Sequence, residues 1–170
     1  AFMRQDATSY IIPDGVTSIG DEAFRGCSSL ANITIPDSVS SIGKGAFYGC
    51  ESLVSVKIPQ GVTRIWNEVF RDCRSLASIS IPDSVTSIGK NAFSNCESLV
   101  DIAIPVSVVS IGEQAFSECC SIKSISIPTG VKTIGYNTFY GCKSLTNIEI
   151  PDSMSSIGNW AFSGCESLVS

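Results

Sequence analysis

The sequence contains no histidine. This absence excludes Ser-His-Asp and Cys-His nucleophile systems, metal sites built on imidazole, and the commonest general base. An enzyme with this composition would have to work with carboxylates, lysine, tyrosine or cysteine alone. The sequence therefore argues against catalysis before any motif is considered.

Charge and long apolar runs are also scarce. Charged residues make up 16% of the chain, below the roughly 25% of an ordinary globular domain. The formal net charge is −5, whereas a nucleic-acid partner would require a basic face. No apolar run approaches the ~18 residues of a membrane span. We therefore expect neither a nucleic-acid partner nor a membrane span. The chain begins at Ala1 without a secretory signal, so that we expect an excised or mature segment.

What the sequence does contain is one unit repeated every 23 residues without insertion or deletion. An Ile-Pro pair begins each unit and accounts for all seven prolines. The isoleucines of these pairs are Ile12, Ile35, Ile58, Ile81, Ile104, Ile127 and Ile150. With the isoleucine as position 1, every unit has phenylalanine at position 13 and cysteine at position 16. Such periodicity predicts a solenoid, in which each coil packs on its neighbours.

One stretch of each unit has the alternation of a β-strand. In "NITIP", Asn32 to Pro36, apolar and polar residues alternate until proline ends the strand. The stretch "GKNAFSNC", Gly89 to Cys96, leaves room for one helical or 3₁₀ turn. One strand per unit followed by a tight return predicts a right-handed coil whose strands form a parallel sheet.

The cysteines at position 16 raise the question of metal, disulfide or packing roles. No Cys-x-x-Cys pair exists, which argues against zinc. Adjacent coils would allow the Cα separation of about 4.4–6.8 Å that a disulfide requires, but seven equivalent cysteines cannot all pair. We favour a ladder of buried free thiols. Cys120, at position 17, is expected to be exposed and reactive.

Position 9 is glycine in six units, which predicts a turn with positive φ. Trp66 replaces it in the third unit, so that either this residue is strained or the turn does not need positive φ. Several cations lie nearby in the sequence, Lys57 among them. A tryptophan with cations can form a recognition spot, and drift of a single repeat is the alternative. The candidate secondary patch consists of Arg64, Trp66, Arg71 and Arg74.

The outward strand positions, 21 and 23, are polar, small and variable, whereas the inward positions hardly change. A fixed interior with a variable exterior suits a surface-recognition scaffold. The candidate binding face consists of Asn32, Thr34, Ser55, Lys57, Ser78, Ser80, Asp101, Ser124, Ser126, Asn147 and Glu149. It has no aromatic anchors, so that each contact should be weak and affinity would need area or multivalency.

The segment Leu76 to Cys96, "LASISIPDSVTSIGKNAFSNC", carries the motif L-x-x-I-x-I-P-x-x-V-x-x-I-G-x-x-A-F-x-x-C. This motif resembles the BspA-like branch of the leucine-rich repeats over about residues 10 to 170. The resemblance implies a leucine-rich-repeat solenoid with a concave parallel β-sheet and short 3₁₀ or helical turns on its convex side. It also implies surface-exposed or secreted proteins used in adhesion and protein binding, and it brings no catalytic or cofactor residues.

The expected organisation is a lead-in or partial cap over residues 1–11 and a single solenoid domain of seven repeats over residues 12–170, the last incomplete. The expected function is a non-catalytic interaction scaffold, without cofactor or metal, in a cell-surface or secreted adhesin-like protein that binds a protein ligand. A structural spacer for another domain is the alternative. An uncapped end or edge could also pair two copies.

Overall fold

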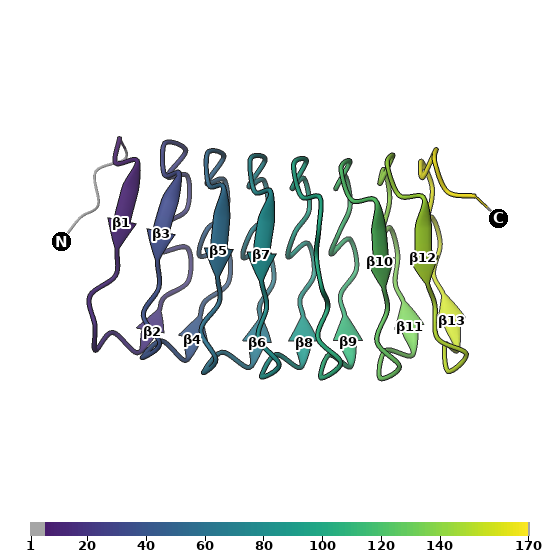
Figure 1. Ribbon diagram of the computed structural model, residues 1–170, viewed down its shortest axis with the longest axis horizontal. Coiled ribbons are helices and arrows are strands. Elements are labelled where there is room, and N and C mark those ends of the chain that lie inside the picture. The colour runs from purple at the N-terminus through teal and green to yellow at the C-terminus, as the bar shows by residue number, and fades with distance from the viewer. Residues whose placement is uncertain (1–5, 170) are drawn as a thin grey trace.

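A computed structural model describes residues 6–169 and shows one coil per repeat. The coils lie side by side along the long axis, with the N- and C-terminal ends at opposite ends of the row (Figure 1). Strands of neighbouring coils pair in parallel, with Tyr10 opposite Ile33 and Val56 opposite Ile79. The repeat solenoid expected from the sequence is confirmed. We number the coils one to seven after the units that begin at Ile12 through Ile150.

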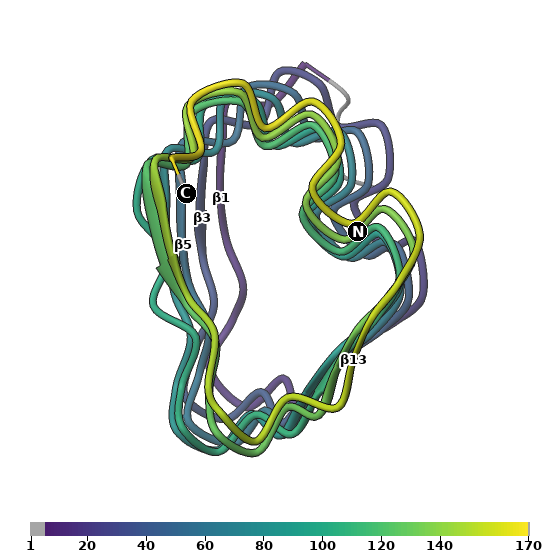
Figure 2. The same cartoon turned by 90° about the vertical axis from the view of Figure 1, so that its right-hand side faces the viewer.

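The first ladder is the one that the alternation predicts. Its strands form the orders β1-β3-β5-β7 and β10-β12, and they occupy one side of the coils, which we call the sheet face (Figure 2). β1 lies in the expected lead-in, of which residues 1–5 are outside the described residues. The strands are β1 (Ser9–Ile11), β3 (Asn32–Thr34), β5 (Ser55–Lys57), β7 (Ser78–Ser80), β10 (Ser124–Ser126) and β12 (Asn147–Glu149).

A second parallel ladder, which the sequence did not predict, lies on the side of the coils away from the sheet face (Figure 2). It follows the proline turn and uses positions 7 and 8 of each unit, so that the expectation of one strand per unit was wrong. Its strands are β2 (Ser18–Ile19), β4 (Ser41–Ile42), β6 (Arg64–Ile65), β8 (Ser87–Ile88), β9 (Ser110–Ile111), β11 (Thr133–Ile134) and β13 (Ser156–Ile157). We call this the short-strand face.

The arc that returns each coil to the sheet face consists of successive turns, without a helical or 3₁₀ segment in residues 6–169. Positions 11 and 15 have positive φ in every coil, as in Asn91 (54°) and Asn95 (60°). A right-handed helical turn cannot pass through such residues, which explains why the expected 3₁₀ turn does not form.

The glycines at position 9 do not have positive φ, contrary to the expectation from the sequence. Their role is to let neighbouring coils approach. A methyl group on Gly112 would lie 2.5 Å from the backbone nitrogen of Lys90, and one on Gly89 would lie 2.6 Å from that of Asn67. Position 9 is therefore glycine because the backbone of the preceding coil occupies the place of a side chain.

The core is a set of stacked columns, one for each apolar position. The phenylalanines from Phe24 to Phe162 form one column with ring centroids 5.3 to 5.5 Å apart and nearly parallel planes. Tyr10 extends this column at its N-terminal end, 5.6 Å from Phe24. The central rings, such as Phe93, are fully buried, so that each coil stabilises the next through hydrophobic contact and ring stacking.

The cysteines at position 16 form a column of hydrogen-bonded free thiols. From coil two onward, each of these thiols donates to the phenylalanine carbonyl of the preceding coil, as from Cys73 to Phe47 and from Cys96 to Phe70, both 3.1 Å. Burial raises the pKa of Cys50 to about 12 and that of Cys96 well above its ordinary value. All eight cysteines are free, which agrees with the expected ladder of inert thiols.

Serine hydroxyls hold the proline turns of neighbouring coils together. Ser38, Ser84 and Ser107, at position 4, each donate to a valine carbonyl of the preceding coil at 2.7 to 2.8 Å. Position 4 is glycine at Gly15 in coil one, which begins the ladder, and at Gly61 and Gly130 in coils three and six. The same two coils begin new blocks of the second ladder, because β4 does not pair with β6 and β9 does not pair with β11. Loss of the hydroxyl therefore coincides with each break in that ladder.

Gly61→Ser should stabilise the protein. A Cβ at this residue would lie 3.2 Å from the Val39 carbonyl oxygen, so that a hydroxyl can reach this acceptor after a small local shift. One such hydrogen bond contributes about 0.5–1.5 kcal/mol, and a chain of this size gains about 2–4 °C per kcal/mol. Thermal unfolding should show the increase for Gly61→Ser but a smaller one for Gly61→Ala, which supplies the Cβ alone. Equal melting temperatures for the two variants would contradict the hydroxyl explanation.

Candidate interaction surfaces

The candidate residues of the sheet face are all exposed and lie on one side of the coils. They alternate with inward side chains such as Val56 (4% exposed) and Ile125 (4%). The period of two along each strand produces this division between the interior and the surface. The structure thus brings the candidates together on one face as a row of mostly small polar groups.

A hollow of about 460 Å³ lies at the N-terminal half of the sheet face. Thr34, Ser55 and Lys57 line it together with Asp14 and Asp37. These side chains provide two carboxylates, one ammonium group and two hydroxyls, which suit a polar ligand better than an apolar one. The sequence alone did not associate the two aspartates with this face.

The sheet face is interrupted at Asp101, which makes only an isolated bridge to Ser78. The gap between β7 and β10 is visible in Figure 1. Asp101 and Ala103 flank Ile102, and both residue types are depleted in strands. Beside the gap lies a second hollow of about 290 Å³, lined by Ala103, Ser124, Ser126, Asn147 and Glu149 with the intervening Ile102 and Ile125.

The structure divides the candidate secondary patch into two parts. The Arg64 guanidinium lies over the Trp66 ring, 4.7 Å from its centroid, on the short-strand face. Arg71 instead lies over Tyr48 and close to Glu68, and Arg74 pairs with Glu97 at 2.6 Å. Both of these arginines are on the arc. Proximity in sequence did not bring the four residues into one cluster.

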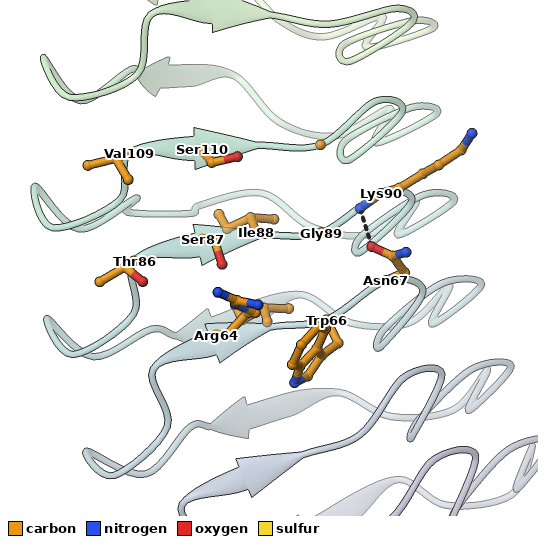
Figure 3. Close-up of a pocket in the computed structure, with 12 residues that line it drawn as sticks. Arg64, Trp66, Asn67, Thr86, Ser87, Ile88, Gly89, Lys90, Val109 and Ser110 are labelled. Atoms are coloured by element: carbon orange, nitrogen blue, oxygen red, sulfur yellow. Dashed lines mark hydrogen bonds between the residues drawn. The ribbon is translucent and has the colours of Figure 1, made fainter.

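A groove of about 540 Å³ runs beside Arg64 and Trp66 across coils three to five (Figure 3). Its lining includes Gly89 and Gly112 together with the hydroxyl-bearing residues Thr86, Ser87 and Ser110. The groove was not predicted from the sequence. The repeat pattern could have indicated it, because glycine at position 9 and serine at position 7 leave a strip without large side chains.

The coil repeat and its two ladders can be compared with known proteins. The family described as BspA type leucine-rich repeat region (6 copies) matches residues 1–119 and 109–170. The chain belongs to the BspA-type leucine-rich repeat family. A comparison with curated proteins finds no match.

The chain is also similar to solved structures of leucine-rich repeat proteins. A leucine-rich repeat protein of T. pallidum is 38% identical over 96% of this chain and 79% of its own, with a TM-score of 0.91. One from Bacteroides ovatus is 35% identical over 96% of this chain and 48% of its own, with a TM-score of 0.78. A leucine-rich cell surface protein of Faecalibacterium prausnitzii is 32% identical over 97% of this chain and 59% of its own, with a TM-score of 0.69. The BspA-type chain thus spans about half the length of the Bacteroides protein.

The described residues include no group of three metal-ligating side chains, and no helix among them could cross a membrane. Cys120 is half-buried rather than exposed, with its thiol 3.8 Å from the Glu118 carboxylate. Burial and this carboxylate raise the pKa of Cys120, so that it is a poorer nucleophile than the sequence suggested.

Proposed function

We propose that this chain is a non-catalytic interaction module of a cell-surface or secreted protein, and that it binds other macromolecules through its sheet face. The observation that carries the proposal is the contrast along each strand. The inward residues repeat almost unchanged, whereas the exposed ones include Lys57, Asp101 and Glu149 among serines and asparagines. The stability of the fold does not require the exposed residues to vary. Variable exposed residues on a constant interior suit a surface that recognises a ligand.

Two further observations support the proposal. BspA-type repeat proteins are typically non-catalytic, and this sequence has no histidine. The Faecalibacterium relative is described as a cell surface protein. A protein ligand outside the cell is the partner that these observations favour, since the net charge is −5 and a nucleic-acid partner would require a basic face.

The proposed contact surface has consequences for affinity. Its residues are short and polar, and the two hollows are shallow sites without aromatic side chains. Hot spots of protein interfaces are enriched in tryptophan, tyrosine and arginine, which this face lacks. A single module should therefore bind weakly, and several copies on one surface should bind through avidity.

Charge reversal on the sheet face should abolish binding. We expect the double variant Lys57→Glu, Asp101→Lys to lose binding in an array of extracellular proteins, because the two charges lie on the same face. Lys132→Glu is a matched control, since Lys132 is exposed and precedes β11 on the short-strand face. Binding that survives the double variant would remove the sheet face from the proposal.

A structural spacer is the second candidate function. It is favoured by the row of coils, which places the two ends of the described chain far apart along the long axis (Figure 1). The two functions differ in what the sheet face must do. In a spacer, the charge-reversal variant would leave every property of the full-length protein unchanged.

A further inference from the structure

The short-strand face departs from the repeat pattern in one coil. Two replacements coincide in coil three. Position 7 is serine or threonine in the other coils but Arg64 here, and position 9 is glycine in the others but Trp66 here. The two residues are neighbours on one side of β6, and they form the stacked pair described above.

The stack is interrupted where Trp66 stands. In coils two, four, five and seven, the glycine amide at position 9 donates to an isoleucine carbonyl of the preceding coil, as from Gly89 to Ile65 at 2.8 Å. Within residues 6–169, Trp66 makes no such bond to Ile42 and Gly135 makes none to Ile111, so that the interruption does not depend on the tryptophan alone. The Trp66 side chain is 44% exposed, so that it does not serve to fill the core. A local rule broken without structural gain points to function.

Arg64 is distinctive among the arginines in the described part of the chain. Arg25 and Arg74 pair with glutamates, and Arg71 lies near two carboxylates. No carboxylate lies within 4.0 Å of Arg64. A guanidinium that lies over an aromatic ring and has no carboxylate partner can offer its N–H groups to a planar anion. Arg64 is thus oriented and available for an anionic ligand.

The groove beside this pair carries no negative charge. Its lining holds Arg64 and Lys90 but no carboxylate, although the whole chain has a net charge of −5. The Lys90 side chain points away from Arg64 and pairs with Glu113 at 3.3 Å, which leaves Arg64 as the main charge (Figure 3). The groove volume is within the about 300–1,000 Å³ of ordinary ligand sites.

We infer that this groove binds an acidic polysaccharide through a uronate carboxylate on Arg64. The hydroxyls of Thr86, Ser87 and Ser110 and the Asn67 amide can exchange hydrogen bonds with sugar hydroxyls. The exposed part of the Trp66 ring offers an apolar surface to the C–H face of a sugar ring. The glycine strip, Gly89 and Gly112, admits an extended chain lying across coils three to five. An acidic peptide is disfavoured, because apart from Trp66 the groove offers only Val109 as an exposed apolar anchor.

The test uses a galacturonate tetramer as the probe in isothermal titration calorimetry. Wild-type protein should bind it with a Kd of ~1 mM or lower, and higher salt should weaken binding. Arg64→Ser and Trp66→Gly should each weaken binding about tenfold or more. Both variants restore the residue type of neighbouring coils, so that they should fold, and Trp66→Gly should melt no lower than the wild type.

Three controls distinguish the inference from its alternatives. A neutral galactose tetramer should bind at least tenfold more weakly than the uronate, because it lacks the carboxylate. Tetraglutamate should also bind more weakly, and Lys57→Glu on the sheet face should bind the uronate like the wild type. The inference would be overturned if the wild type did not bind the uronate, or if Arg64→Ser or Trp66→Gly bound it as tightly as the wild type. It would also be overturned if tetraglutamate bound more tightly than the uronate, or if Lys57→Glu lost uronate binding.

Discussion

Raising the pH from about 8 to about 11 is expected to unfold this protein, with the cysteine column as the main cause. Five thiols of the column are fully buried and have raised pKa values, at Cys50, Cys73, Cys96, Cys119 and Cys142. In the unfolded chain these thiols would ionise near the ordinary pKa of 9.0. The folded chain keeps them protonated, so that the two states bind different numbers of protons.

The sign of the effect follows from proton linkage. Above the unfolded pKa, the unfolded chain binds fewer protons than the folded one, and the free energy of unfolding falls as the pH rises. Below that pKa both states are protonated and the stability contributed by the neutral thiols is fully present. Each buried thiol lowers the free energy of unfolding by about 1.4 kcal/mol per pH unit, and five thiols lower it by about 7 kcal/mol per unit. Since a domain has about 5–15 kcal/mol in total, a midpoint of about pH 10–11 is expected.

Urea unfolding at a series of pH values, in the presence of a reductant, measures this dependence. Cys96→Ala should be less stable than the wild type at pH 7, because it loses the hydrogen bond to Phe70. Its free energy of unfolding should nevertheless fall less steeply above about pH 9, by about 1.4 kcal/mol per pH unit. Cys120→Ala is the matched control, since that thiol is only half-buried and should change the slope less. An unchanged slope in Cys96→Ala would contradict the role of the column.

The core and the sheet face were predictable because both depend on patterns within one repeat. The fixed spacing of Phe93 and Cys96 indicated stacked columns, and the alternation around Ile33 indicated a strand with its neighbours exposed. The structure places Asn32 and Thr34 outward on β3 in agreement with that alternation. Such patterns are local, and a close repeat copies them unchanged into every coil.

The features that escaped prediction depend on contacts between coils. The second ladder uses strands of two residues, too short to show a period of two. The φ > 0 residues include Glu68 and Gln114, which sequence statistics do not associate with left-handed backbone. Arg71 and Trp66 are five residues apart in the chain, yet one lies on the arc and the other on the short-strand face. In a coil of this kind, residues that are only a few positions apart in the sequence can lie on different faces.

Gly112→Ala is expected to destabilise the protein strongly, because position 9 has no room for a side chain. The added Cβ would lie 2.5 Å from the Lys90 nitrogen and 2.6 Å from the Gly89 carbonyl carbon. Both contacts are with backbone atoms, which can yield only if coils four and five separate. That movement would break the hydrogen bond from Gly112 to Ile88, now 2.8 Å. We expect a loss of about 3 kcal/mol, or about 6–12 °C in Tm.

Gly20→Ala is the matched control for this prediction. Gly20 occupies the same position in the first coil, where a Cβ would meet nothing within 4 Å. Both residues lack positive φ, so that alanine is compatible with the backbone at either site. Thermal unfolding should therefore show little change for Gly20→Ala, and hydrogen exchange at residue 112 should be faster in Gly112→Ala than in the wild type. If the two variants lost the same stability, the glycines would be required by their own backbone conformation and not by the approach of the preceding coil.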